Sequence, residues 1–374
     1  MSKKLLCPIS KSKNFKKIYT IKKFPIFMGV SKAPSKYKFN NLNWWINSKS
    51  GNIQIYPKIS LEKLYFRSHG SGTVGKTWNN HHNSFFSLLK PYLRGNICEI
   101  GGGNNSILTK IKNFSKINSF YSFDKNLKIK KKNKKIFSIK KFFNKNFFDK
   151  KKIKFNLVVH SHTFEHLYDP VSFLKVINSI LQKNGRHIFT IPNMSSMVKR
   201  GYANAMNFEH PFFFDEKLVV ALLYNNNFKI IKKIYYKKDH SIMYVTKVSE
   251  VLKFTKYLQY KKNLKNFMTM FDLWKKDIEK INKLITRSEK IFIFGAHIFS
   301  QLMIFNGLNK KNIYGILDND KKKNNKYLYG TKFKIFNPRI LKNFLLPKVI
   351  LRAGPYNAEI KKQILLINPN TIII

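Results

Sequence analysis

The chain is poor in cysteine, in acidic residues and in long apolar runs. Only two of its 374 residues are cysteines, Cys7 and Cys98. Two thiols cannot form a disulfide framework, so we expect a reducing compartment. The N-terminal stretch has no long apolar core with a small-residue cleavage site, and no apolar run reaches the roughly 18 residues of a membrane-spanning helix. These absences predict a cytoplasmic protein without a membrane span.

Acidic residues are scarce enough to leave a formal net charge of +54, from 72 Lys+Arg and 18 Asp+Glu. Such an excess ordinarily suggests nucleic acid or an anionic membrane surface as a partner. Here the excess is mostly lysine, is spread along the whole chain and accompanies abundant Asn, Ile and Phe, as an AT-rich genome would favour. We therefore interpret it as compositional and expect no nucleic-acid partner, since no RNA-binding module is recognisable. The lysine-rich block 125–154 stays open as a positive surface for an anionic substrate.

The length and the 43% hydrophobic content are sufficient for two or three packed domains. Residues 1–75 suggest a small, loop-rich module with short strands. Residues 76–249 alternate short apolar strands with helical stretches, which predicts an α/β fold with a mainly parallel sheet. Residues 250–374 suggest a helical connector followed by a second α/β unit. A monomer is the simplest expectation for three modules in one chain.

Four strands are expected in the middle region, and two more follow one another without a helix between them, which suggests a closing antiparallel pair. The expected strands cover residues 96–100, 119–124, 156–161, 186–192, 228–236 and 240–246.

A glycine cluster, "ICEIGGGNN", lies between the first of these strands and a helical stretch. Bare backbone at Gly101, Gly102 and Gly103 lets a ligand approach the main chain, and a helix N-terminus adds free N–H groups. A P-loop would require Gly-Lys-Ser/Thr after the glycines, and a dinucleotide fingerprint would require glycine where Ser106 stands. The pattern that remains is Glu-x-Gly-x-Gly, beginning at Glu99.

Two later features support this interpretation. Asp124 ends the next strand, where a carboxylate can accept hydrogen bonds from both ribose hydroxyls, although dinucleotide enzymes use the same geometry. The segment "LVVHSHTFEHLYDP" (157–170) resembles the one after the fourth strand of class I methyltransferases. That resemblance implies that Glu99, the glycine turn and Asp124 bind S-adenosylmethionine and that His162 contacts it. The alternative for His162, His166 and Asp169 is local capping and turn packing.

The stretch 204–245 is similar to a segment of the nucleotide-sugar C-methyltransferases. Glu209 and His210 match the Glu-His pair of that family, in which the histidine is proposed to take a proton from the carbon beside a sugar ketone. Imidazole next to a carboxylate is a base suited to neutral pH. The alternative is a loop anchor. The Tyr-His that precedes the pair in the family is Asn207-Phe208 here. Of the family's later Gly-Gly-Ser-Leu-Arg strand only Ser241 is kept, and the resemblance makes it a candidate substrate residue.

The family begins with a zinc module of two Cys-x-x-Cys pairs. At the corresponding positions this chain keeps Cys7 but has Ser10, Asn47 and Ser50. Neutral hydroxyl and amide groups are poor zinc ligands, so we predict no metal there and a module that depends on packing for its stability.

The resemblance also implies residues that close over the cofactor and the sugar. Tyr65, His69 and His82 are candidates for substrate contact in the segment before the catalytic domain. The pair His81-His82 could suggest a metal, but adjacent helical residues point about 100° apart, so substrate or capping roles are favoured.

The last third resembles the C-terminal Rossmann-like domain of the same enzymes. Gly295 forms a strand-to-helix turn, and Asp318 ends the next strand as a ribose-binding carboxylate would. We interpret this unit as a docking domain for the nucleotide-sugar rather than a second cofactor site, with a purely structural role as the alternative. Asn357 and Glu359 are its candidate substrate residues.

Together these features predict an S-adenosylmethionine-dependent C-methyltransferase that acts on a nucleotide-linked keto-sugar, a small-molecule partner. The alternatives are methylation of another small molecule or of RNA, or a non-catalytic relative.

Overall fold

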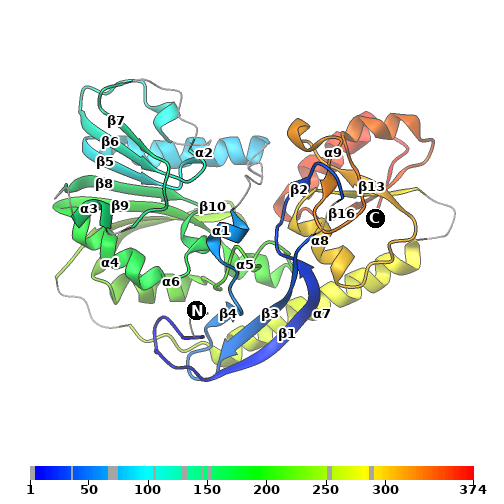
Figure 1. Ribbon diagram of the computed structural model, residues 1–374, viewed down its shortest axis with the longest axis horizontal. Coiled ribbons are helices and arrows are strands. Elements are labelled where there is room, and N and C mark those ends of the chain that lie inside the picture. Colours follow the sequence, from blue (N-terminus) through cyan, green and yellow to red (C-terminus); the bar gives the residue numbers. More distant parts are fainter. Residues whose placement is uncertain are drawn as a thin grey trace.

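The computed structural model has two sheet-and-helix bodies that are joined by an N-terminal β-structure and one long helix (Figure 1). The residues that it describes are 5–34, 37–65, 75–103, 107–127, 133–144, 146–149, 153–250, 255–285 and 290–374. Among them, none of the helices combines the length and the apolar character that crossing a bilayer requires.

The first body is built on a seven-stranded sheet with the order β10-β11-β9-β8-β5-β6-β7. Pairing is parallel from β9 to β7, whereas β10 and β11 add an antiparallel pair at the other edge. The α/β fold with a mainly parallel sheet is therefore confirmed. The strands are β5 (Gly95–Ile100), β6 (Ile117–Phe123), β7 (Ile136–Ile139), β8 (Phe155–Ser161), β9 (Leu181–Pro192), β10 (Phe228–Tyr236) and β11 (Ser241–Val248).

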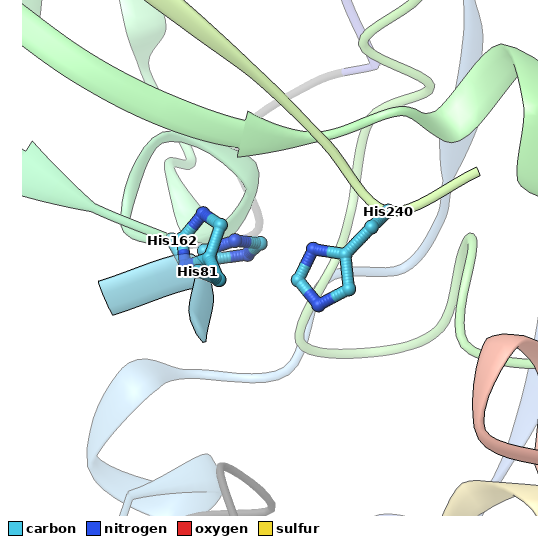
Figure 2. Close-up of side chains that lie close together, drawn as sticks. All are labelled: His81, His162 and His240. Carbon is cyan, nitrogen blue, oxygen red and sulfur yellow. The ribbon is translucent and has the colours of Figure 1, made fainter. Parts of the chain in front are cut away.

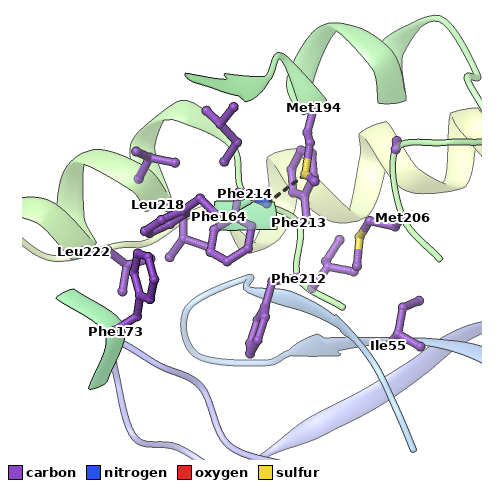
Figure 3. Close-up of a cluster of buried hydrophobic side chains, with 14 of the residues drawn as sticks. Ile55, Phe164, Phe173, Met194, Met206, Phe212, Phe213, Phe214, Leu218 and Leu222 are labelled. Carbon is purple, nitrogen blue, oxygen red and sulfur yellow. Dashed lines mark hydrogen bonds between the residues drawn. The ribbon is translucent and has the colours of Figure 1, made fainter. Parts of the chain in front are cut away.

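Alternate residues of these strands pack against helices on opposite faces of the sheet. Ile97 and Val159 belong to the cluster that includes Phe85 of α2 (Lys76–Leu89). The neighbouring residues Cys98 and Val158 face the other layer, which Figure 3 shows as a dense group of aromatic and aliphatic side chains. The helices that contribute to that layer are α4 (Pro170–Ile180), α5 (Met194–Lys199) and α6 (Glu216–Tyr224).

The lysine-rich block also forms regular structure. It contributes the edge strand β7 and the short helix α3 (Asn146–Asp149). We had considered this block only for its charge.

The second body has a five-stranded parallel sheet with the order β15-β13-β12-β16-β17. Its elements are β12 (Ile291–Phe294), α8 (Ile298–Phe305), β13 (Ile313–Leu317), β15 (Ile335–Phe336), β16 (Lys348–Leu351), α9 (Asn357–Ile367) and β17 (Ile372–Ile373).

The N-terminal region is more regular than the loop-rich module we expected. Its sheet has the order β1-β3-β4, and two of its strands are long: β1 (Phe15–Pro25) has 11 residues and β3 (Phe39–Asn47) has 9. Helix α7 (Tyr260–Leu284) supplies the surface that these strands cover. Tyr19 stacks on Phe271 with ring centroids 4.1 Å apart, and the fully buried Trp44 contacts both Phe271 and Trp274.

This region also contacts both bodies. Strand β4 (Ile53–Ile55) exchanges backbone hydrogen bonds with residues 211 and 213, before α6. Strand β2 (Val30–Ser31) pairs with β14 (Tyr327–Leu328) of the second body. The short helix α1 (Leu61–Leu64) then leads toward the first body.

The four positions of the expected zinc module do lie together. Cys7 Sγ is 3.3 Å from Ser50 Oγ and accepts a hydrogen bond from the Ser10 amide. Asn47 Oδ1 accepts hydrogen bonds from both the amide and the hydroxyl of Ser50, each at 3.0 Å. Neutral hydrogen-bonding groups thus link the two turns where the resemblance implies thiolates.

Candidate functional site

Two cavities meet at the glycine turn after β5. The smaller is about 190 Å³ and lies toward α2, and the larger is about 370 Å³ and lies toward Asp124. Gly101, Gly103 and His162 line both of them. An elongated ligand that crosses the turn would therefore occupy both cavities.

The turn itself is shaped by contacts within the protein. Glu99 is buried; its Oε1 accepts a hydrogen bond from the Ile107 amide at 2.7 Å, and its Oε2 accepts one from Ser122 at 3.2 Å. A Cβ on Gly102 would lie 2.6 Å from Glu99 Oε2. Gly101 has φ +74°, where non-glycine residues are rare, and an added Cβ would lie 2.3 Å from Thr163 Oγ1. Glu99 therefore anchors the loop that surrounds the smaller cavity.

Asp124 is half-buried at the end of β6. Its carboxylate accepts hydrogen bonds from the amides of Asn126, at 2.6 Å, and Gly103. Burial raises its pKa, which those two amides partly counteract. Aromatic rings flank it in the larger cavity: Phe123, Phe142, Phe143 and Phe173. This combination fits S-adenosylmethionine: Asp124 and the aromatic rings of the larger cavity would hold its ribose and adenine, and the glycine turn its amino-acid half.

His162 lies where these cavities meet a third one. Its φ of +49° is in the left-handed region, which is strained for a residue with a Cβ and is often found at functional sites. The ring is held at both nitrogens, by Glu165 Oε1 at Nδ1 and by Ser241 Oγ at Nε2, each at 3.0 Å. His162, which we predict to contact the cofactor, thus lies at the junction of all three cavities.

The third cavity, of about 450 Å³, lies between the two bodies. Its walls include Tyr65 and Met28 from the N-terminal region, the Glu209-His210 pair from the first body, and Asp318, Lys323, Tyr356 and Glu359 from the second.

His210 is a basic group of this cavity whose tautomer is fixed by the backbone. Its Nδ1 lies 2.9 Å from the carbonyl oxygen of Asn204, which can only accept, so Nδ1 carries the proton and Nε2 keeps its lone pair. Burial lowers the pKa of His210. The ring of His166 is 4.7 Å away, and Tyr65 Oη is 2.7 Å from His166 Nδ1.

Glu209 is buried, and this burial raises its pKa to about 8. The carboxyl group is therefore mainly protonated at neutral pH, unlike the carboxylate we expected to assist His210. Asn207 Oδ1 accepts hydrogen bonds from the backbone amides of both Glu209 and His210, at 2.8 and 3.1 Å. We had regarded Asn207 only as a departure from the family pattern; here it fixes the turn that presents the pair.

The other predicted substrate residues have varied surroundings. His82 lines the smaller cavity on the cofactor side. Ser241 is fully buried between His162 and His240, so it would act on a substrate only through those rings. Asn357 Oδ1 accepts from the Ala353 amide, and Glu359 accepts from the Lys76 amide and the Thr77 hydroxyl at the start of α2. His69 lies outside the described residues.

The structure also bears on the His81-His82 pair and on Asp169. His81 and His82 diverge, and His81 lies buried among His162 and His240. Asp169 caps α4 by accepting from the amide and hydroxyl of Ser172, which supports the capping interpretation for this residue.

Comparison with known proteins identifies the class of the first body. Residues 81–233, less than half of the chain, match the sequence model of a methyltransferase domain. None of the curated proteins compared with the chain matches it. Over residues 81–233 the chain is therefore similar to a methyltransferase domain, and S-adenosylmethionine is the cofactor whose shape and polarity the two adjoining cavities fit.

Solved structures resemble the chain only distantly. An S-adenosylmethionine-dependent methyltransferase from Mesorhizobium loti has 10% identity and a TM-score of 0.37, over 46% of this chain and 100% of that one. One from Clostridium acetobutylicum has 12% identity and a TM-score of 0.34, over 50% and 96%. Magnesium protoporphyrin IX methyltransferase from Synechocystis, solved with bound SAH, has 14% identity and a TM-score of 0.36, over 50% and 93%. At this distance they carry no argument about the substrate.

Proposed function

We propose that the protein is a C-methyltransferase for a nucleotide-linked keto-sugar and that His210 is its base. The observation that carries the proposal is the tautomer of His210. Its Nε2 keeps a lone pair, and the residue lines the cavity between the two bodies. A carbon acceptor must lose a proton before it can be methylated, whereas a thiol or an amine can react without such a strong demand for a base.

The bound cofactor supplies an electrophilic methyl group. The protein's part is to make and hold the nucleophile. His210 Nε2 removes the proton from the carbon next to the ketone, and its lowered pKa keeps it unprotonated at neutral pH. Glu209, protonated because of its raised pKa, donates a hydrogen bond to the ketone oxygen as negative charge develops there. Their surroundings thus move the two pKa values apart, so that His210 can act as the base and Glu209 as the acid in enolate formation.

The size and the lining of the third cavity support a substrate larger than a free sugar. The cavity reaches from His210 to Asp318 and Lys323, at the turn after β13 of the second body. Nucleotide-linked substrates have an anionic, hydrogen-bonding portion that such a distant polar wall can hold while the sugar lies at His210. The second body would then be the docking domain for the nucleotide.

Proton exchange tests the base without requiring methyl transfer. A panel of nucleotide-linked keto-sugars would be incubated in heavy water with S-adenosylhomocysteine and the protein, and loss of the α-proton would be followed by NMR. We expect His210→Gln to slow exchange by about 10³-fold, since positioned bases contribute roughly 10²–10⁴-fold.

The variant's affinity for S-adenosylhomocysteine, measured by calorimetry, should be unchanged and serves as the folding control. Undiminished exchange in His210→Gln would remove His210 as the base. Absence of exchange with every keto-sugar in the wild-type protein would count against the acceptor class.

A further inference from the structure

Three histidines outside the proposed proton chemistry converge at the inner end of the site (Figure 2). They are His81 on α2, His162 in the turn after β8, and His240 just before β11. One ring nitrogen from each lies within 4.8 Å of those of the other two. His81 and His240 are almost fully buried, at 0% and 2% exposure.

Two of the three rings have a buried nitrogen that no described residue satisfies. These atoms are His81 Nδ1 and His240 Nε2. The other nitrogen of each ring is held, His81 Nε2 by Thr190 Oγ1 at 3.2 Å and His240 Nδ1 by Ser241 Oγ at 2.6 Å. A buried polar atom without a partner is costly and calls for an explanation. A ligand between the rings would provide one.

The hydrogen bonds around His162 define which nitrogens carry protons. The Glu165 carboxylate can only accept, so His162 Nδ1 donates to it and Nε2 accepts from the Ser241 hydroxyl. The Ser241 oxygen then accepts from His240 Nδ1. His240 Nε2 therefore carries no proton, and its lone pair is available to an electrophile.

We propose that His81, His162 and His240 bind a divalent first-row transition-metal ion. Imidazole nitrogen is a ligand that such ions prefer. The His162–Glu165 contact is also the arrangement by which a second-layer carboxylate orients a metal-binding histidine. Binding would exchange the His162–Ser241 hydrogen bond for a bond to the metal. Glu165 would offset part of the added positive charge.

Three protein ligands leave one position open, which is typical of a catalytic rather than a structural site. His162 and His240 line the cavity between the two bodies, so the open position would face the acceptor. In the proposed function, which this step presupposes, an acceptor oxygen would take that position and be polarised there. Metal binding itself does not depend on the identity of the acceptor.

Cobalt titration tests the site directly. Untagged full-length protein, stripped with a chelator, would be titrated with Co²⁺ while its visible d–d absorption is recorded. We expect one ion per chain and a spectrum of low coordination number. His240→Ala should weaken binding by more than about 100-fold, since loss of even a second-layer partner typically costs 10- to 100-fold.

A matched control uses the neighbouring histidine. His82→Ala removes an imidazole beside His81 that is not one of the three, and it should leave Co²⁺ affinity within about twofold. Glu165→Gln keeps the hydrogen-bonding shape without the charge and should weaken Co²⁺ by about tenfold. Circular dichroism and urea unfolding would establish that each variant is folded.

The proposal is overturned if the wild-type protein fails to bind Co²⁺, or if His82→Ala weakens binding as much as His240→Ala does. The titration contains no acceptor, so failure of every keto-sugar would refute the proposed function and leave the metal site standing. If His240→Ala does not fold, a titration of His240→Gln decides instead, because Glu165 also lies within ligand distance of His166 and His210.

Discussion

The chain contains two strand–glycine–helix turns with an acidic residue after the next strand, and they differ in what their carboxylates do. After β5, Asp124 lines an aromatic cavity and accepts from two nearby amides. After β12, Asp318 Oδ2 accepts from the Ala296 amide at 2.8 Å and from Lys323 Nζ at 3.0 Å, and its Oδ1 accepts from the Asp320 amide.

The comparison shows that the same pattern can build a binding site or a closed turn. Lys323 is almost fully buried against Asp318, so a ribose would have to displace a buried ion pair to reach that carboxylate. At Asp124 no such pair stands in the way among the described residues. The second turn thus favours docking or structure over a second cofactor site.

The largest expected difference between the turns is in cofactor affinity. Asp124→Ala should weaken S-adenosylhomocysteine binding by about 100-fold, because two hydrogen bonds to a charged acceptor are worth about 3 kcal/mol together. Asp318→Ala should change this affinity by less than about twofold. Titration calorimetry measures both. Equal losses in the two variants would mean that the second turn also contributes to the cofactor site.

A smaller difference is expected in stability. The substitution Gly101→Ala has two costs. The residue has a positive φ, and the added Cβ clashes with Thr163, whose hydroxyl donates a hydrogen bond to the carbonyl of Ile100. At Gly295, with φ +106°, nothing lies within 4 Å of an added Cβ, so only the backbone cost remains. We expect losses of about 3 and 1 kcal/mol in the free energy of unfolding. Urea unfolding of the two variants tests this order, and equal losses would contradict it.

The smallest expected effect is on the pH dependence of the methylation rate. It tests whether His210 and Glu209 of the first body supply the base and the acid. The proposed mechanism requires His210 unprotonated and Glu209 protonated. The rate should therefore reach half its plateau on the alkaline side near pH 8, where Glu209 ionises, and fall on the acid side only below the ordinary histidine pKa of about 6.5.

In Glu209→Gln, whose amide still donates, the alkaline limb should vanish while the acid limb stays. A profile that keeps its fall near pH 8 in this variant would assign that limb to another group.

Local sequence patterns were sufficient for most of the first body. The strands at β5, β6, β8 and β9 have short apolar runs between turn residues, and they lie where we expected them. Strand β7 was missed because it is a four-residue edge strand with no fully buried residue, and lysines flank it on both sides. Strands β1 and β3 were underestimated because the surface they cover, α7, lies far along the chain.

The site was predictable where a motif is contiguous, as at Glu209 and His210, and not where topology assembles it. His81, His162 and His240 are distant in sequence. They meet because antiparallel β11 begins at the edge where β8 and β9 end, with Ser241 opposite Pro192. No local pattern contains that information. The protonation of Glu209 likewise depends on burial, which no local pattern shows.

The pairing of β2 with β14 has a consequence for the order in which the protein is built. Tyr37, beyond β2, donates to the carbonyl of Thr331, 294 residues later. During synthesis the N-terminal strands therefore emerge long before their partners exist, whereas the methyltransferase domain depends on nearer contacts. On the ribosome the cofactor-binding body is expected to fold first. The wall that the second body gives to the cavity between the two bodies forms only after residues 290–374 have been synthesised.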